Sequence, residues 1–226
     1  MKKLFIAAAV AAISSGALAA DLKPYIEGQL GWSNLDDVKT KTYSASFDGG
    51  TASGNIKTEY DSSISGGIEL GIKNVAIENL RLGASYQTMK FDMEKVTGTA
   101  TFAGTGQNYI NNGTYTGDIT TDIRSAGISL DNRVNLYMVN AYYDIKNSSA
   151  FTPFVGFGIG MADVKNAKDN EFAWSASVGG KYNITPNVYL GLKASYVGVN
   201  GITDKLGIKY EDHDAYSGQA LLGYEF

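Results

Sequence analysis

The chain of 226 residues contains no cysteine, only three prolines and a single histidine. Without cysteine there is no disulfide framework, no thiolate metal site and no thiol nucleophile. Beyond the N-terminal segment, no stretch reaches the roughly 18 consecutive apolar residues that a membrane-spanning helix requires. These absences exclude a disulfide-stapled scaffold, a cysteine-dependent enzyme and a helical membrane protein. A β-barrel is not excluded, because its strands are apolar only at alternate positions.

The N-terminus has the pattern of an export signal. Lys2 and Lys3 precede an apolar run over 4–13, and the small-residue pattern Ala17-Leu18-Ala19 follows. This order predicts a secretory signal peptide over residues 1–20, cleaved after Ala19 or Ala20. Its removal leaves 17 basic against 23 acidic residues, a mature net charge of −6. An acidic mature chain of this kind does not suggest a nucleic-acid partner.

The last twelve residues, 215–226, alternate with a period of two. One face carries Tyr216, Leu222, Tyr224 and Phe226 with small residues between them, and the other face is mostly polar. Such alternation predicts a β-strand with one apolar face. Its length suits a strand that crosses a bilayer at a tilt. Taken alone, the segment also fits an edge strand of a soluble sandwich.

The rest of the chain decides between these two interpretations. Alternating segments occupy 23–32, 62–72, 80–91, 134–145, 152–163, 172–184, 188–199 and 215–226. The links between them alternate in length: 34–61, 92–133, 164–171 and 200–214 are the longer ones, and 74–79, 146–151 and 185–187 are short turns. Bacterial barrels have short periplasmic turns and longer outer loops. The pattern predicts an all-β, eight-stranded, antiparallel up-and-down transmembrane barrel, with a ten-stranded barrel as the alternative. Part of the longest link, near 115–123, is expected to extend strands beyond the membrane.

Two motifs carry a family resemblance. The segment Phe151-Thr-Pro-Phe-Val-Gly-Phe-Gly-Ile-Gly160 and the terminal Tyr224-Glu-Phe226 resemble the small outer-membrane barrels, the superfamily of OmpA-type transmembrane domains and opacity-like surface proteins. The resemblance covers 21–226 and implies one barrel domain with both termini in the periplasm of a Gram-negative bacterium. It further implies contact with outer-membrane lipid and lipopolysaccharide, a monomer, and a last strand (Leu222, Tyr224 and Phe226) read as a signal by the barrel assembly machinery.

Aromatic residues on the outward face are expected to form two girdles at the membrane edges. With the termini in the periplasm, the outer girdle contains Trp32, Tyr137, Phe172, Trp174, Tyr196 and Tyr216, and the periplasmic girdle contains Tyr143, Tyr182, Tyr224 and Phe226.

Charged residues occupy the inward face of the same strands. They are Glu27, Glu69, Arg81, Asp144, Lys181, Lys193 and Glu225, four acids against three bases, toward the periplasmic half. An eight-stranded barrel is just wide enough for its side chains to fill it. Buried charges need partners, so we expect a charge network that closes the lumen and leaves one carboxylate protonated or bound to water. Paired carboxylates could also serve acid–base catalysis, but a closed lumen gives a substrate no access.

Two further patterns have a chemical and a structural interpretation. Gly156, Gly158 and Gly160 continue a period-two strand, so they favour space for side chains across the lumen, such as Tyr142, Leu136 and Met138, over a nucleotide loop. His213 could activate a serine, or hold a divalent ion with Asp212 and Asp214. We favour a histidine in a solvated loop. No cofactor, metal site or catalytic group is therefore expected.

Function enters here only through the resemblance. It implies a non-enzymatic surface protein whose loops 34–61, 92–133 and 200–214 meet a host or extracellular ligand, or support the envelope. The Tyr, Ser, Asn and Gly content of these loops suits adaptable binding and equally suits a merely soluble loop. Two alternatives stay open: a narrow passive channel for small or hydrophobic solutes, and a lipid-modifying outer-membrane enzyme.

Overall fold

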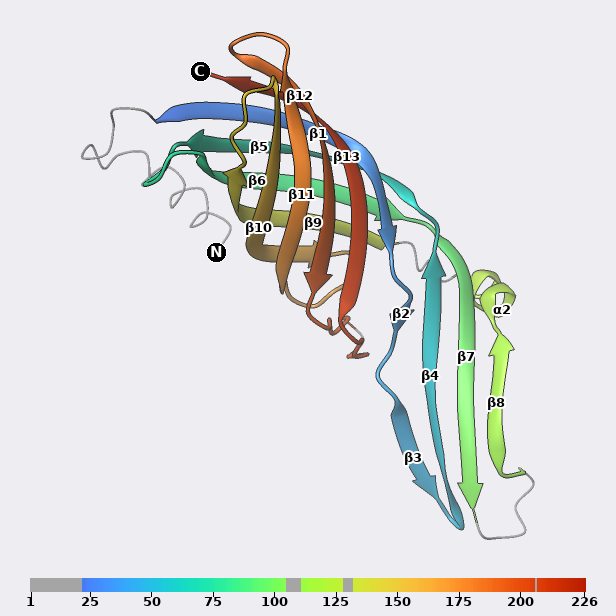
Figure 1. Cartoon of the computed structure of the whole chain (residues 1–226). Coiled ribbons are helices and arrows are strands. Elements are labelled where there is room, and N and C mark those ends of the chain that lie inside the picture. The colour runs from blue at the N-terminus through green and yellow to red at the C-terminus, as the bar shows by residue number, and fades with distance from the viewer. Residues whose placement is uncertain (1–21, 105–110, 128–131, 206) are drawn as a thin grey trace.

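The computed structural model describes residues 22–104, 111–127, 132–205 and 207–226. The expected signal peptide, 1–20, lies outside these residues. The chain forms a closed antiparallel barrel of eight strands (Figure 1). They are β1 (Lys23–Leu35), β5 (Ser63–Lys73), β6 (Leu80–Phe91), β9 (Asn132–Asp144), β10 (Phe151–Val164), β11 (Glu171–Asn183), β12 (Val188–Val199) and β13 (His213–Glu225). This confirms the predicted eight-stranded barrel, and the ten-stranded alternative is wrong.

Alternation positions the side chains as the sequence predicts. In β1, Tyr25, Glu27 and Gln29 are buried in the lumen, whereas Leu30 and Trp32 are 63% and 70% exposed on the outside. The cause is the pleat, which sends successive side chains to opposite faces of a strand. The first and last strands pair through eleven residues, from Tyr25 opposite Glu225 to Leu35 opposite Ala215, and this pairing leaves the barrel without a free edge.

A second sheet was not predicted. The segments expected to be loops, 34–61 and 92–133, contain β2 (Val38–Lys39), β3 (Tyr43–Phe47), β4 (Gly50–Tyr60), β7 (Met93–Gly104) and β8 (Gly113–Asp118), followed by the helix α2 (Thr120–Ser125). The order is β2-β4-β7-β8, with β3 also paired to β4. We call these five strands the projecting sheet. Figure 1 shows it extending away from one end of the barrel.

The projecting sheet is an extension of the barrel wall. Only residues 61–62 separate β4 from β5, and only Asp92 separates β6 from β7, so two neighbouring barrel strands continue outward as a paired ribbon with a register shift between Glu59 and Tyr60. The hairpin between β3 and β4 turns at Asp48-Gly49, where Gly49 has φ 82°. A turn with a positive φ at its second central residue favours glycine, which adopts this left-handed conformation without strain. The sheet is therefore held by regular pairing from the membrane outward.

The link 200–214 fastens the base of this sheet. The Lys41 N–H donates to the Lys209 carbonyl at 2.8 Å, and the Glu211 N–H donates to the Lys39 carbonyl at 2.9 Å. The Lys209 N–H donates to the Tyr43 hydroxyl at 2.6 Å. The same link places Ile202 in the apolar core at this end of the barrel. Among the described residues, the helices are too short or too polar to cross a membrane.

Candidate functional site

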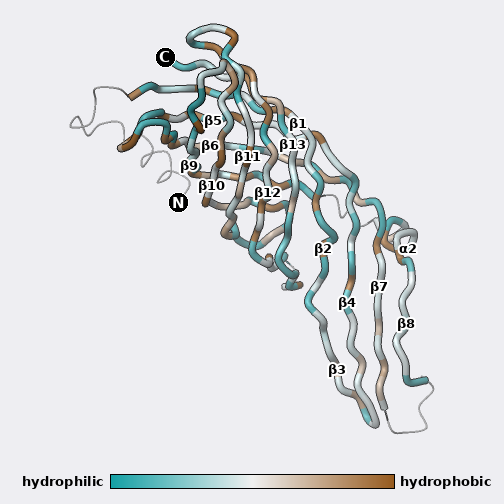
Figure 2. Tube along the Cα trace, viewed as in Figure 1, coloured by the Kyte–Doolittle hydropathy of each residue, from teal (hydrophilic) through white to brown (hydrophobic). Residues whose placement is uncertain are grey.

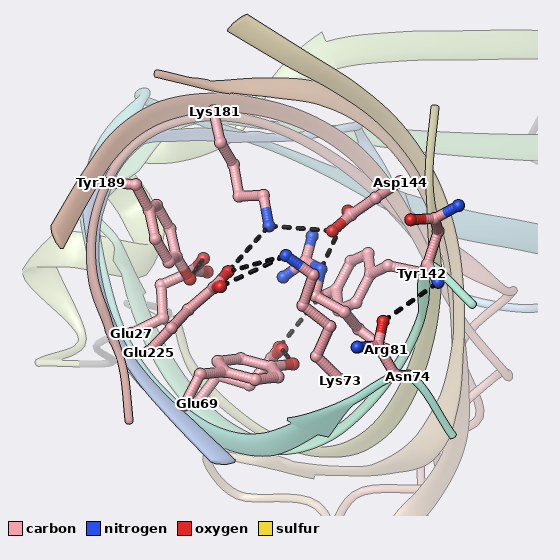
Figure 3. A network of polar contacts seen from close by, with 12 residues as sticks. Glu27, Glu69, Lys73, Asn74, Arg81, Tyr142, Asp144, Lys181, Tyr189 and Glu225 are labelled. Atoms are coloured by element: carbon pink, nitrogen blue, oxygen red, sulfur yellow. Dashed lines mark hydrogen bonds and ion pairs between the residues drawn. The ribbon is translucent and has the colours of Figure 1, made fainter. Parts of the chain in front are cut away.

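A chain of ion pairs crosses the lumen at the end where the short turns lie (Figure 3). Arg81 Nε donates to Asp144 Oδ1 at 3.0 Å, and Lys181 Nζ donates to Asp144 Oδ2 at 2.9 Å. Lys181 also lies 3.4 Å from Glu225 Oε1, which Lys73 approaches from the other side, 3.2 Å from Oε2. Arg81, Asp144 and Lys181 have side chains at most 2% exposed. These five residues form the lumen network.

Two glutamates complete the filling, and within the described ranges they accept hydrogen bonds from neutral groups rather than forming ion pairs. Glu69 accepts hydrogen bonds from the Tyr25 hydroxyl at 2.6 Å, the Tyr142 hydroxyl at 2.9 Å and the Asn140 amide at 2.8 Å. Glu27 accepts from the Tyr189 hydroxyl at 2.7 Å and from the Gln29 amide at 2.9 Å. A buried carboxylate requires such donors, because water no longer supplies them.

The three tyrosines need space that only glycine leaves. A Cβ added at Gly71 would meet the Tyr25 ring, one at Gly156 the Tyr142 ring, and one at Gly223 the Tyr189 ring. Each glycine therefore allows an aromatic ring to lie flat across the lumen wall and to place its hydroxyl on a carboxylate. The Tyr142 ring also faces the Arg81 guanidinium, 4.6 Å from its centroid, in a cation–π contact.

Two expectations about the charges are wrong. Lys193 was expected to pair directly with a carboxylate, but its Nζ donates to the Gln29 side-chain oxygen at 2.9 Å, and Gln29 in turn donates to Glu27. A surplus acid was also expected. Lys73, the last residue of β5, joins the lumen network and makes four bases for four acids. The sequence pattern missed Lys73 because the expected strand ended one residue earlier.

The other half of the lumen is apolar. Its residues form one buried cluster, the apolar lumen cluster: Leu35, Val38, Met89, Phe91, Val134, Leu136, Met138, Ala162, Val164, Ala173, Val197, Val199, Ile202 and Ala215. Leu136 and Met138 disturb the alternation in the sequence because they belong to this inward apolar layer. As expected, Met138 and Tyr142 fill the space beside the strand glycines Gly160 and Gly156. The lumen is filled by charges at one end, by hydrocarbon at the other, and by small polar side chains such as Ser175 and Ser177 between them.

His213 is not in a solvated loop, contrary to expectation. It is the first residue of β13 and is 5% exposed, beside Leu35, Val199 and Ala215. The strand pleat turns Asp214 to the opposite face, and Asp212 Oδ1 accepts a hydrogen bond from the Gly201 N–H at 2.7 Å. The three side chains do not converge on an ion. No group of three or more His, Asp or Glu residues suited to a metal occurs in the described ranges.

The outward aromatics form a continuous row on four adjacent strands. Phe157, Trp174, Tyr196 and Tyr216 follow one another at centroid distances of 6.5, 5.3 and 5.2 Å across β10 to β13. Trp32, Tyr137 and Phe172 are exposed at the same end of the barrel, and Tyr143, Tyr182, Tyr224 and Phe226 are exposed at the turn end. Leu222, of the expected assembly signal, is 58% exposed on the outer face of β13.

The projecting sheet has two different faces, since paired residues of antiparallel strands share a face. One face carries hydroxyl and amide groups, among them Ser44, Ser46, Thr51, Ser53, Asn55, Thr97, Thr99, Thr101, Thr114 and Thr116. The other face carries Tyr43, Phe47, Ile56, Phe102 and Tyr115 among alanines and glycines. The sheet is mostly pale in Figure 2, which marks near-neutral hydropathy and explains why no strand signal stood out.

Charged contacts brace the base of this sheet. Lys57 of β4 lies 2.6 Å from Asp37 and 3.0 Å from Glu59, and hydrogen bonds to both carboxylates raise the lysine pKa. At the end of β8, Asp118 accepts from the Thr120 hydroxyl and N–H at 2.6 and 2.9 Å, and these bonds lower the Asp118 pKa. Both groups stay charged near neutral pH, so they fix the sheet at its junction with the barrel.

Comparisons with known proteins agree with this geometry. The family model described as outer membrane protein beta-barrel domain matches residues 5–226. The outer membrane protein PagN of Salmonella typhimurium is 35% identical over 101 residues, which cover 37% of this chain and 42% of that protein. The match therefore spans less than half the length of this relative.

Two solved structures share the fold at low identity. Neisserial surface protein A superposes with a TM-score of 0.51 at 15% identity, covering 90% of this chain and 97% of that one. The protein AlkL, solved in lipid bilayers, has a TM-score of 0.50 at 14% identity, covering 90% of each chain.

Proposed function

The chain belongs to the family of outer membrane protein β-barrel domains, and on that premise we propose that it holds the projecting sheet outside the cell as a binding surface. The protein is an outer-membrane protein of the Gram-negative type. The start of β1, the C-terminus and the short turns lie at one end of the barrel, and the projecting sheet lies at the other (Figure 1). In bacterial barrels the short turns are periplasmic, which supports periplasmic termini and an external sheet.

One observation carries the proposal: two neighbouring barrel strands continue, after short breaks at 61–62 and at Asp92, into a sheet that projects from the end of the barrel. A binding surface on such an element is already ordered, so a partner does not bear the entropy of ordering a loop. Its hydroxyl face and its Tyr and Phe face offer hydrogen bonds and rigid apolar area, as adaptable recognition surfaces do. We propose adhesion to an extracellular or host-cell ligand as its role.

The same observations support a non-enzymatic protein with a closed lumen. The lumen network fills the turn end, and the apolar lumen cluster fills the other. His213, the only histidine, has no hydrogen-bond partner at either ring nitrogen among the described residues and lies in an apolar site. A base of that kind has no serine or orienting carboxylate in position for a triad. Neither the solute channel nor the lipid-modifying enzyme gains a specific observation.

Adhesion is testable by removing the projecting sheet alone. Thr40 N–H donates to the Ile56 carbonyl at 2.9 Å, and Ile119 N–H donates to the Val96 carbonyl at 3.0 Å. A two-residue Asn-Gly turn can therefore join Thr40 to Ile56 in place of 41–55. A second such turn can join Val96 to Ile119 in place of 97–118. Cells that display this trimmed protein are expected to bind a cultured epithelial monolayer no better than cells carrying an empty vector.

The matched control is Glu78→Gln, in the short turn at the opposite end, which should adhere like the wild type. The gel shift between heated and unheated samples verifies that both variants form the barrel. Adhesion of the trimmed variant at the wild-type level would show that the projecting sheet is not the binding surface.

A further inference from the structure

β8 is a free edge of the projecting sheet. It pairs with β7 on one side, and no strand in the described part of the chain pairs with the other. All six of its residues are exposed. Proteins usually protect such edges with charges, proline or a bulge, because an open row of N–H and C=O groups templates another strand. Residues 113–117 carry none of these protections.

The direction of the free backbone groups follows from one hydrogen bond. The Ile119 N–H donates to the Val96 carbonyl at 3.0 Å, just beyond the pair of Asp118 with Thr97. Bonded pairs alternate along an antiparallel ladder, so Gly113, Tyr115 and Gly117 bond to β7. The N–H and C=O groups of Thr114 and Thr116 therefore point away from the sheet, toward a possible partner strand.

The sequence of this edge is its own complement. Residues 113–117 read Gly-Thr-Tyr-Thr-Gly in either direction. Suppose that a second copy of the strand pairs antiparallel to the first, with the two Tyr115 residues opposite each other. Thr114 of each copy then lies opposite Thr116 of the other. Both are bonded pairs, so the two copies exchange four backbone hydrogen bonds. The threonine pairs repeat those already formed with β7, Thr99 with Thr116 at 3.2 Å and Thr101 with Thr114 at 2.9 Å.

We propose that β8 is a self-association site, at which the projecting sheets of two copies join edge to edge into one continuous sheet about a two-fold axis at Tyr115. Such a contact is isologous, since the same surface serves on both copies. The other edge, β3, is also exposed, but its start is already bonded to another segment. The link 200–214 lies against its start, where Lys41 and Tyr43 bond to Lys209.

The symmetry selects copies on facing membranes. The two-fold axis of an antiparallel strand pair is perpendicular to the sheet. In a sheet that stands up from a membrane, this axis is parallel to the membrane plane. A rotation of 180° about it turns the second copy upside down, so that copy must sit in a membrane facing the first. Two copies in one membrane are related by an axis along the membrane normal, which would make upright strands parallel. The inference rests on the proposed external position of the sheet, and it adds a homotypic contact between cells.

A single pairing of five residues is a small contact, below the size of stable interfaces. Two facing membranes, however, carry many copies, and simultaneous pairings add through a high local concentration. The contact is therefore expected to cluster membranes while the detergent-solubilised protein stays largely monomeric at micromolar concentration.

A cysteine placed on the axis tests the geometry directly, because the natural chain has none. At a non-bonded antiparallel pair the two Cα atoms are about 4.5 Å apart, within the range of a disulfide. Two sets of phospholipid vesicles carry Tyr115→Cys proteins of different tag length. Oxidation after mixing should yield a disulfide dimer with one long and one short tag. Ser44→Cys, on the β3 edge, should yield no such dimer.

Vesicle clustering, followed by light scattering, tests the same contact without cysteine. Thr116→Pro removes an outward N–H and leaves the backbone hydrogen bonds to β7 intact, although the side-chain contact with Thr99 is lost, so it should abolish clustering. Ser46→Pro makes the matched change on the β3 edge and should leave clustering unchanged, and both variants must show the wild-type gel shift. Clustering by Thr116→Pro, or mixed-tag dimers at Ser44→Cys but not at Tyr115→Cys, overturns the proposal. No host cell is present, so failure here is distinct from failure of epithelial adhesion.

Discussion

Replacing Asp144 by asparagine is expected to lower the free energy of unfolding by about 3–5 kcal/mol, the usual cost of breaking a buried ion pair from one side. Asp144 lies between Arg81 and Lys181, at 3.0 and 2.9 Å, and all three side chains are almost fully buried. The amide keeps the shape of the carboxylate but removes its charge. Arg81 then loses its ion-pair partner, and Lys181 keeps only the longer contact with Glu225, at 3.4 Å.

Two comparisons separate charge from shape. Glu78 and Lys146 form the same kind of ion pair on the surface, with side chains 68% and 64% exposed. Glu78→Gln should therefore change stability by less than about 1 kcal/mol. Adding Lys181→Met to Asp144→Asn removes one of the two buried cations that Asp144 compensated and should recover part of the loss. Urea unfolding in lipid vesicles measures all three variants. An Asp144→Asn barrel as stable as the Glu78→Gln control would mean that the lumen network does not stabilise the fold.

Replacing Gly156 by valine is expected to cost about 2–5 kcal/mol, from overpacking together with a carboxylate that loses a donor. The new side chain would occupy the position of the Tyr142 ring. Tyr142 would then leave Glu69 and lose its contact with the Arg81 guanidinium. The effect is larger than the substitution suggests, because one glycine gives space to a residue that serves two charged groups.

Gly218 supplies the matched control on the outside of the barrel. A Cβ at Gly218 has no neighbour within 4 Å, and valine favours strands, so Gly218→Val should be neutral or mildly stabilising. The same urea unfolding compares the two. Equal stability of Gly156→Val and Gly218→Val would show that Tyr142 is not held by the space above Gly156.

The barrel could be predicted from the sequence because one periodicity determines it. Residues such as Leu30 and Trp32 must face lipid while Glu27 and Gln29 face the lumen, and this requirement marks each strand at the level of single residues. The length of the links then orders the strands. Strand bounds came out within three residues, since the alternation stops where the lipid stops.

The projecting sheet could not be predicted in the same way. Both of its faces meet water, so nothing forces Thr99 and Ala100 into different classes of residue, and the alternation that marks a buried face is weak. Its signal is present only as β-branched threonine at alternate positions, as in Thr97-Gly-Thr-Ala-Thr101. Pairing with a neighbouring strand, rather than burial, creates the sheet.

The partners in the lumen were only partly predictable. The alternation within each strand identifies Glu27, Asp144 and Lys181 as inward, but it does not give the register between neighbouring strands. The register brings Asp144 to Arg81 and leaves Lys193 on Gln29. Tyr25 and Tyr189 lie on the same strand faces as the inward charges Glu27 and Lys193. This position could have identified them as hydrogen-bond donors to the carboxylates.

Planar-bilayer recording tests most directly the claim that the barrel is a closed scaffold for an external sheet. We expect the lumen network and the apolar lumen cluster to leave no continuous path for water, and Asn140 and Ser175 already occupy the space beside Gly158. The purified wild type is expected to show no steady ion conductance. A steady conductance that disappears when Gly158 is replaced by a bulky residue would contradict the closed scaffold and identify the protein as a pore.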